Sequence, residues 1–450
     1  MKHRILLSSF IFSLCILLVH PLIAQDTKSL TLNEAVQLSL QNSKQLKSSR
    51  AKIDEATAVL HEARDGQLPD FKISGSYLRV NNPNINLHTS SKPSTDTTGS
   101  SGSALPKVNQ AVYGMANISY PIYSGNRIKY GIESAKYLEK AASLDAEHDA
   151  GQVIINTIGA YINLYKSKAA VNLVEENLQE SRKRDTDFAN LESNGVIARN
   201  DLLKAQLQTS NIELSLLDAE NNWKLANVNM DLMLGLPENT TIAMDSSSLQ
   251  SPGEIKTVDD YEQIALQNRR DIQALSYRAK AAGTNIKSVK GQYYPSVALS
   301  GGYVALDIPG FVSVTNAIDV GIGVQYSLSS LWKTKAKLEE AKAKENELKA
   351  NEEMLNDEMH YQINEQYEGY LLSLKKIDVY AKAIDQADEN YKITKNKYNN
   401  ALATTTDLLD ADVAQLQAKL NYAFAKADAI VAYNKLILAS GILTDKPGNK

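Results

Sequence analysis

Residues 318–328 read Ile318-Asp319-Val320-Gly321-Ile322-Gly323-Val324-Gln325-Tyr326-Ser327-Leu328, so apolar side chains alternate with small or polar ones. Side chains of a β-strand point alternately to its two faces, so this period of two predicts a strand with one apolar face. Residues 112–122 alternate in the same way. Strands of about ten residues with this pattern are typical of transmembrane β-barrels.

The sequence around these strands occurs twice. Residues 38–80 recur at an offset of 226, and residues 120–235 recur at an offset of 206, without a gap in either stretch. The offsets differ because the connection from Arg79 to Gln110, rich in Ser, Thr, Asn, Gly and Pro, is longer than its counterpart from Asp307 to Ala317. This composition predicts a solvated loop between paired strands, with a disordered linker as the alternative. We therefore expect one architecture built from two similar halves.

Each half has the same predicted order of elements. A helical stretch, 32–67 or 258–292, ends at Pro69 or Pro295, since proline cannot continue a helix. A hairpin follows, and then a proline-free helical stretch, about 127–194 or 333–400, that would extend roughly 100 Å.

The chain then turns and a second helix returns in each half. The turns are expected at residues 195–200 and 401–406, and Asp201 and Asp407 open the return helices. A carboxylate at this position can cap free amides and oppose the positive end of the helix dipole. Each return helix carries two adjacent apolar seams at heptad spacing, as in a closed cylinder of helices, although a bundle helix with one wide apolar face is the alternative.

The N-terminal residues predict export. Residues 1–24 combine Lys2 and Arg4 with an apolar run that holds Cys15, the only cysteine, and end in a small residue, which indicates a secretory signal peptide. We read Cys15 as hydrophobic filler. The predicted organisation continues with a first repeat over 25–235 that contains the hairpin 71–123, and a linker or equatorial segment over 236–257. A second repeat over 258–443 contains the hairpin 296–328, and a tail covers 444–450.

Composition argues against several functional classes. The formal net charge is −4, whereas nucleic-acid binding favours a basic patch. No glycine-rich phosphate loop is present, and the histidines beyond the predicted signal peptide lack metal-ligand spacing. These are His61, His88, His148 and His360. We expect no catalytic residues, no cofactor and no metal site.

The four predicted strands raise the question of closure. A sheet in lipid must close so that no edge stays unpaired, and bacterial barrels start at eight strands. One chain cannot close alone. Several copies must each contribute four strands, and the same symmetry would gather their helices into one tube.

At this point the chain resembles the TolC-like outer membrane efflux proteins. The strand-to-helix junction Tyr120-Pro121-Ile122-Tyr123-Ser124-Gly125 and the two helical tips, residues 194–205 and 397–411, are similar to the patterns of that family. The resemblance implies an α+β membrane protein, internally duplicated. It also implies a homotrimer whose 12-stranded transmembrane β-barrel continues into a long periplasmic α-helical barrel. It further implies a location in the outer membrane, with a periplasmic adaptor protein and an inner membrane transporter as partners.

The resemblance also points to a pore constriction. Asp407 and Asp410 match the aspartates that narrow the pore of that family, and Tyr398 matches a neighbouring tyrosine. Asp407 and Asp410 are three residues apart and share a helix face, so three copies would gather six carboxylates that concentrate cations. Asp201, the counterpart of Asp407, is included in this predicted gate. Helix capping is the alternative role for Asp407.

Two features of the tips complete the expectations. An arginine of well-studied members corresponds to Ala403, so an arginine lock is not expected there, and Arg199 is the substitute. The resemblance implies that adaptor helices dock on the tips, although single exposed apolar residues are also common at surfaces. The predicted docking residues are Gly195, Val196, Ile197, Ala401, Leu402 and Ala403.

The predicted function is a passive trimeric exit duct of a tripartite efflux or type I secretion system. The alternative is a periplasmic structural coiled-coil protein without a pore. That alternative explains the heptad seams. It does not explain the two hairpins, whose strands alternate apolar and polar residues over a membrane-spanning length.

Overall fold

The computed structural model describes residues 27–81, 108–245 and 255–443. They divide into two compact units. Unit 1 takes described residues from Met1–Arg50, Asp145–Ile272 and Met354–Lys450, and unit 2 is formed by those within Ala51–Leu144 and Gln273–Glu353. Each unit therefore contains parts of both repeats. The predicted signal peptide, most of the long loop after Arg79 and the tail 444–450 lie outside the described residues.

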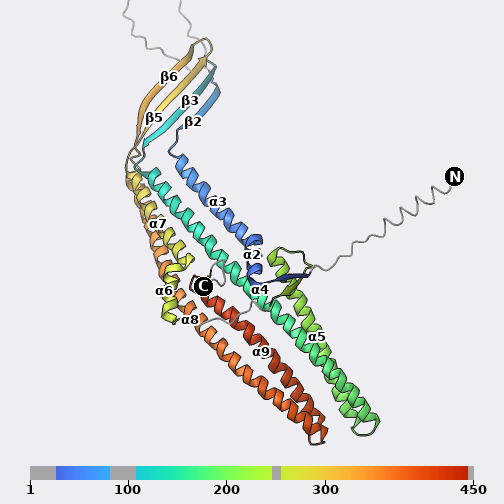
Figure 1. Cartoon of the computed structure of the whole chain (residues 1–450). Coiled ribbons are helices and arrows are strands. Elements are labelled where there is room, and N and C mark those ends of the chain that lie inside the picture. The colour runs from blue at the N-terminus through green and yellow to red at the C-terminus, as the bar shows by residue number, and fades with distance from the viewer. Residues whose placement is uncertain (1–26, 82–107, 246–254, 444–450) are drawn as a thin grey trace, which may run out of the picture. The chain divides into compact units, whose positions relative to one another are not determined.

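Unit 2 contains an antiparallel four-stranded sheet in the order β2-β3-β5-β6 (Figure 1). Its strands are β2 (Asp70–Arg79), β3 (Gln110–Tyr123), β5 (Ser296–Ile308) and β6 (Val312–Gln325). The predicted hairpins are thus present, and β3 of the first pairs with β5 of the second. Strands β2 and β6 are the two edges of this sheet.

The alternating side chains of the strands are exposed in the single chain. Ile73 is 90% exposed, and Ile318, Val320, Ile322 and Val324 on β6 are each at least 69% exposed. An apolar row of this length on an edge strand is a template for association unless a partner covers it.

The connection between β5 and β6 is shorter than expected. Residues 307–317 were predicted as a loop, but β5 extends to Ile308 and β6 begins at Val312. The reason is a tight turn in which Pro309 precedes Gly310 at φ +74°, and the Phe311 amide donates to the Ile308 carbonyl. Proline followed by a residue with positive φ is the arrangement of a type II turn.

Two glycines fix the junction between strands and helices in unit 2. Gly125, at φ +65°, lies against Gly291, so that a Cβ atom on either residue would clash with the other backbone. Gly291 opens the short 3₁₀ helix η2 (Gly291–Tyr293) just before β5. The glycine of the motif that ends β3 is therefore required by a close backbone approach.

The helices match the predicted pattern except for one break in each repeat. The first stretch divides into α2 (Leu32–Asn42) and α3 (Lys44–Asp65), and its counterpart into α6 (Val258–Asn268) and α7 (Arg270–Lys290). Ser43 and Arg269, which correspond at the offset of 226, interrupt them with ψ angles of 122° and 118°. The Ser43 hydroxyl accepts from the Leu46 amide, so a new helix begins there.

The long helices are α4 (Arg127–Ser193) and α8 (Ser330–Asn399), and the return helices are α5 (Arg199–Leu234) and α9 (Thr405–Ala439). Unit 1 contains one core cluster centred on each repeat, and the first also includes Ala427 of α9. In the first, Leu164 of α4 and Met230 of α5 are fully buried, and in the second, their counterparts Tyr370 and Leu436 are buried. Hydrophobic burial thus follows the duplication of the sequence.

A small parallel sheet in unit 1 was not expected. Strand β1 (Thr27–Leu30) pairs with β4 (Thr241–Met244), which lies within the segment predicted as a linker over 236–257. Asn227 holds it in place, since its side-chain amide donates to the Thr240 carbonyl and accepts from the Ile242 amide. The strands are four residues long, too short for a period of two to stand out in the sequence.

Candidate functional site

The tips of both helical hairpins have the same backbone geometry. Gly195 and Ala401, which correspond at the offset of 206, have φ angles of +71° and +58°. The Val196 amide donates to the Leu191 carbonyl, and the Leu402 amide to the Lys397 carbonyl, each at 2.8 Å. This is the Schellman arrangement that ends a helix with a left-handed residue. Alanine takes the glycine position in the second tip.

The predicted docking residues divide into exposed and packed ones. Val196 is 67% exposed and Leu402 is 76% exposed, at equivalent positions of the two turns. Ile197 packs against a cluster that contains Phe188, Ala205 and Leu408, and Ala403 is half-buried. Each tip therefore presents one large apolar side chain at the same place.

Asp407 takes part in a capping box. Thr404 is the N-cap of α9: its hydroxyl accepts from the Asp407 amide, and the Asp407 carboxylate accepts from the Thr404 amide at 2.8 Å and from its hydroxyl at 2.7 Å. The hydrogen bonds from the Thr404 side chain and backbone hold the pKa of Asp407 below its usual value. Asp407 therefore does take part in helix capping, its alternative role. It does so as the third residue of the helix, while Thr404 is the N-cap.

Asp201 does not cap its helix, contrary to expectation. The N-cap of α5 is Ala198, which has no side-chain acceptor, and the Asp201 carboxylate is 3.4 Å from Lys204 Nζ. The reason is the substitution of alanine at the position that Thr404 occupies in the second repeat. Asp201 still lies in the first turn, where a negative charge favours the helix dipole.

The other predicted gate residues occupy different environments. Asp410 is exposed on α9. Tyr398 stacks on Phe188 with ring centroids 5.4 Å apart, and so joins the two tips. Its hydroxyl is buried, without a hydrogen-bond partner among the described residues.

A buried ion pair near the tips was missed by the sequence analysis. Arg184 Nη2 of α4 lies 2.8 Å from Asp412 Oδ2 of α9, and the Asn177 side-chain amide donates to Asp412 Oδ1 at 3.3 Å. The two charged side chains are 8% and 1% exposed. Asp412 follows the predicted Asp407 and Asp410 closely, and its position between Ala411 and Val413 of the apolar seams was the available signal of burial.

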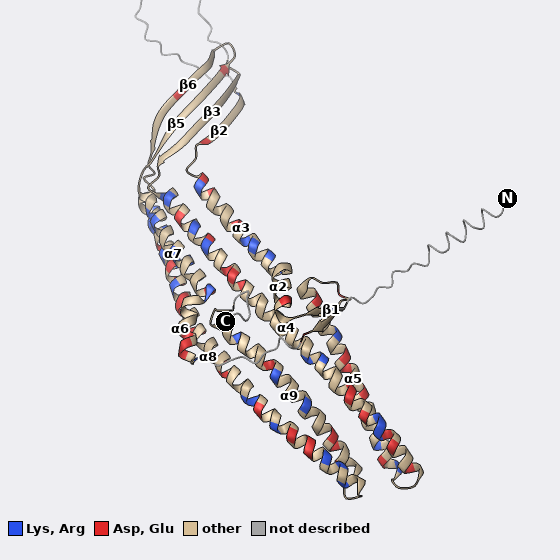
Figure 2. Ribbon diagram, viewed as in Figure 1, with Lys and Arg blue, Asp and Glu red and all other residues tan. Residues whose placement is uncertain are grey.

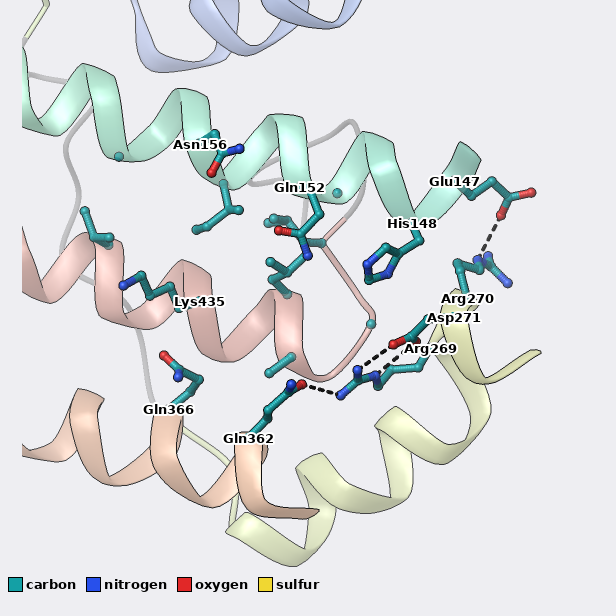
Figure 3. Close-up of a pocket in the computed structure, with 18 of the residues that line it drawn as sticks. Glu147, His148, Gln152, Asn156, Arg269, Arg270, Asp271, Gln362, Gln366 and Lys435 are labelled. Atoms are coloured by element: carbon teal, nitrogen blue, oxygen red, sulfur yellow. Dashed lines mark hydrogen bonds and ion pairs between the residues drawn. The ribbon is translucent and has the colours of Figure 1, made fainter. Parts of the chain in front are cut away.

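A cavity of about 930 Å³ in unit 1 contains a cluster of charged and polar side chains (Figure 3). Arg269 binds Asp271 through two hydrogen bonds and Gln362 through a third, and Arg270 pairs with Glu147 at 2.9 Å. Burial acts to raise the pKa of Asp271, but the hydrogen bonds and charge of Arg269 outweigh it and hold that pKa below its usual value. Four charged groups of this cavity thus form two ion pairs, as in a structural network.

Two general observations apply to the described ranges. No group of three or more histidine, cysteine, aspartate or glutamate side chains could hold a metal ion there. Likewise, within these ranges no helix is both long and apolar enough to cross a membrane.

Several contacts between repeats in unit 1 join α4 to α9, and α5 also packs against α9. Lys166 pairs with Asp428 at 2.7 Å, Arg184 with Asp412, and a Leu438 methyl approaches Gly151. In this way α9 of the second repeat covers one side of α4 of the first.

The equivalent residues of α5 and α8 are exposed. Subtracting 206 from the α9 positions gives Asn222, Gln206 and Leu232 on α5, and adding 206 to the α4 positions gives Leu372, Asn390 and Asp357 on α8. A stripe of leucines three, four, seven or eight residues apart runs along α5, and its members are at least 52% exposed. They are Leu203, Leu207, Leu214, Leu217, Leu225 and Leu232. On α8, Met354, Tyr361, Leu372 and Val379 are at least 53% exposed.

A family model and a curated relative that match this chain are both described as outer membrane efflux proteins. The family model described as outer membrane efflux protein matches residues 35–236 and 262–442. The outer membrane efflux protein BepC of Brucella suis biovar 1 (strain 1330) is 23% identical over 441 residues, which cover 94% of this chain and 88% of that protein.

Solved structures share the fold. The outer membrane protein VceC of Vibrio cholerae matches with a TM-score of 0.74 at 18% identity, over 91% of this chain and 96% of that one. The CmeC outer membrane channel of Campylobacter jejuni matches with a TM-score of 0.72 at 18% identity, over 91% of this chain and 85% of that one.

Proposed function

Because the chain belongs to the outer membrane efflux protein family, we propose that three copies of it form an outer membrane channel. This channel is the passive exit duct of a tripartite efflux or type I secretion system. A periplasmic adaptor protein links it to an inner membrane transporter, which supplies the energy. The duct itself needs no catalytic residue and no cofactor.

The observation that carries the proposal is the pair of exposed faces on α5 and α8. Within one chain, α9 covers α4, and the duplication gives α5 and α8 the same face without the same partner. A second copy supplies it when α5 of one chain packs on α8 of the next. Such a heterologous contact repeats around an axis and closes into a ring.

The sheet of unit 2 supports the same assembly. Its free edges are β2 from the first repeat and β6 from the second, so β6 of one copy can pair with β2 of the next. Three copies make a closed barrel of twelve strands, which leaves no backbone edge exposed to lipid. The non-pore alternative would leave the apolar residues of β6 in water.

The tip residues take two roles in this proposal. The pore is narrowed by Asp407, Asp410 and Asp201, with Tyr398. Asp410 is the better carboxylate to test, because Asp407 also belongs to the capping box of α9. Gly195, Val196, Ile197, Ala401, Leu402 and Ala403 form the adaptor docking surface, with Val196 and Leu402 as its exposed apolar contacts.

Single-channel recording in planar bilayers tests the duct and its gate together. Asp410→Asn is expected to lower the preference for potassium over chloride by about twofold or more, because three carboxylates leave the constriction. Asp378→Asn, an exposed aspartate on α8, is the matched control and should change the preference little. Absence of any conductance would contradict the duct, and equal effects of the two variants would contradict the carboxylate ring.

A further inference from the structure

Basic side chains gather in unit 2 where helices meet strands. Lysine and arginine lie on α4, α7 and α8 close to the sheet, as the blue segments of Figure 2 show. The stretches 127–138, 279–290 and 328–338 contain nine basic residues and one acidic residue, Glu133, in a chain of net charge −4. The basic residues, here called the basic collar, are Arg127, Lys129, Lys136, Lys280, Lys287, Lys290, Lys333, Lys335 and Lys337.

The collar is not explained by ion pairs within the chain. Lys129, Lys290, Lys333 and Lys335 are exposed, and none of them pairs with a carboxylate among the described residues. Lys337 donates to the Gln292 side chain, and Lys287 lies over the Tyr130 ring. These positive charges are therefore exposed in the single chain and not neutralised by carboxylates of the described residues.

Helix stability does not explain the collar either. Helices α2, α5, α6, α7 and α9 have an acidic residue in the first turn, which favours the helix dipole. Helices α3, α4 and α8 have none. Of these, α4 and α8 begin beside strands, and Arg127, Lys129 and Lys333 stand at their starts. A positive charge there opposes the dipole. Lys287 and Lys290 do favour the end of α7, so the unexplained charges are those of α4 and α8.

An apolar and aromatic rim accompanies the collar. Trp332 and Leu328 are each 65% exposed, next to Lys333 and Lys335, and Tyr294 is 59% exposed between Lys290 and β5. Tryptophan and tyrosine beside lysine are typical of the boundary between the apolar and polar layers of a membrane.

We propose that the basic collar binds the anionic headgroups of phospholipids in the leaflet that borders the helices. Lysine ammonium groups attract lipid phosphates and anionic headgroups, while the rim of Trp332, Leu328 and Tyr294 inserts at the depth of the first acyl carbons. This inference rests on the proposed function, because it needs the sheet in a membrane. It fixes how deep the sheet sits and gives the protein a preference among lipids.

Trp332 provides a direct probe, since the chain has only two tryptophans. With Trp223→Phe, the full-length protein is reconstituted in vesicles that contain bromine-labelled lipid, either zwitterionic phosphatidylcholine or anionic phosphatidylglycerol at the same mole fraction. Quenching of Trp332 by the anionic lipid is expected to exceed quenching by the zwitterionic one. Conductance of the same vesicles reports on the channel.

Charge variants identify the residues responsible. Lys290→Gln, Lys333→Gln and Lys335→Gln together are expected to reduce the preference for anionic lipid by about fivefold for each charge in contact with a headgroup. Lys224→Gln, Lys375→Gln and Lys382→Gln remove the same charge from exposed positions of unit 1 and should leave the preference unchanged.

The outcomes separate this inference from the channel proposal. Two results in conducting vesicles would contradict lipid binding by the collar and leave the channel proposal intact. One is equal quenching by both lipids, and the other is the same preference for anionic lipid in both triple variants. If inorganic phosphate abolished the preference at constant ionic strength, the collar would be a phosphate-ion site and the lipid assignment wrong. Protein that neither inserts nor conducts would contradict both.

Discussion

At the scale of single residues, the two tips differ in a way that can be measured. Gly195 adopts a left-handed conformation with nothing near its missing Cβ, whereas Ala401 adopts the same conformation with a side chain. Gly195→Ala is expected to destabilise its turn by about 1 kcal/mol, and Ala401→Gly to relieve a similar cost. Hydrogen exchange of the amides in residues 191–205 and 397–411 measures both changes. Slower exchange in Gly195→Ala would contradict this account.

Asp231 predicts a dependence on pH. Its side chain is fully buried, Asn227 donates to Oδ2 at 3.0 Å, and Oδ1 has no hydrogen-bond partner among the described residues. Burial, and then the charge of Glu238, raises its pKa from 3.8 to about 6. The folded state therefore holds a proton that the unfolded state has lost, so stability falls as pH rises from 3.8 to about 6 and stays reduced above it.

Asp231→Asn removes this penalty. At about pH 7.5 the variant is expected to be more stable by up to about 3 kcal/mol, and near pH 4 by much less. Thermal midpoints followed by circular dichroism in detergent measure the difference. Glu238→Gln should shift the midpoint in the same direction by less. An equal effect of Asp231→Asn at both pH values would show that charge is not the cause.

Residue-level prediction from sequence succeeded where a local motif carried the information. The placement of Asp407 at the start of α9 and the exposed apolar Val196 and Leu402 follow from the turn pattern. Asp201 was misjudged because capping depends on its neighbour, Ala198, which has no acceptor. Asp412 was missed because its partner Arg184 is distant in the sequence and comes from another helix.

At the scale of elements, the Arg184–Asp412 pair joins α4 to α9. Asp412→Ala leaves a buried guanidinium without its counter-ion and is expected to cost about 3–5 kcal/mol. Arg184→Met with Asp412→Leu replaces the pair by apolar groups and should restore most of that stability. A double-mutant cycle on thermal midpoints measures the coupling.

An exposed pair that joins α4 to α5 serves as the control. Arg182 and Glu213 also lie 2.8 Å apart, but their side chains are 62% and 46% exposed. Glu213→Ala is expected to cost less than about 1 kcal/mol, because solvent screens the pair. A similar cost for Glu213→Ala and Asp412→Ala would contradict the role assigned to burial.

Elements were predicted well where their periodicity was long. The strands and long helices follow from periods of two and 3.6 over many residues. The breaks at Ser43 and Arg269 were missed because both flanking helices continue the same apolar pattern. Strands β1 and β4 were missed because four residues show no clear period, and their pairing joins segments far apart in the sequence.

At the scale of the whole molecule, duplication predicts assembly. The contacts of Lys166, Arg184 and Gly151 of α4 with α9 inside one chain have exposed counterparts on α8 and α5. The sequence shows this only as two seams on each return helix. The packing of α4 against α9 is needed to tell which seam is covered within the chain. The other seam is the one that a second copy can cover.

Cross-linking at one predicted contact tests this claim most directly. Leu438 approaches Gly151 within the chain, so the duplication places Leu232 of one copy beside Asp357 of the next. In membranes from cells that produce Leu232→Cys with Asp357→Cys, a short thiol cross-linker is expected to give covalent dimers and trimers and nothing larger. Leu232→Cys with Lys392→Cys, which pairs α5 with a distant level of α8, should remain monomeric. Absence of cross-linked dimers, or a ladder that continues beyond three copies, would contradict the closed three-fold duct.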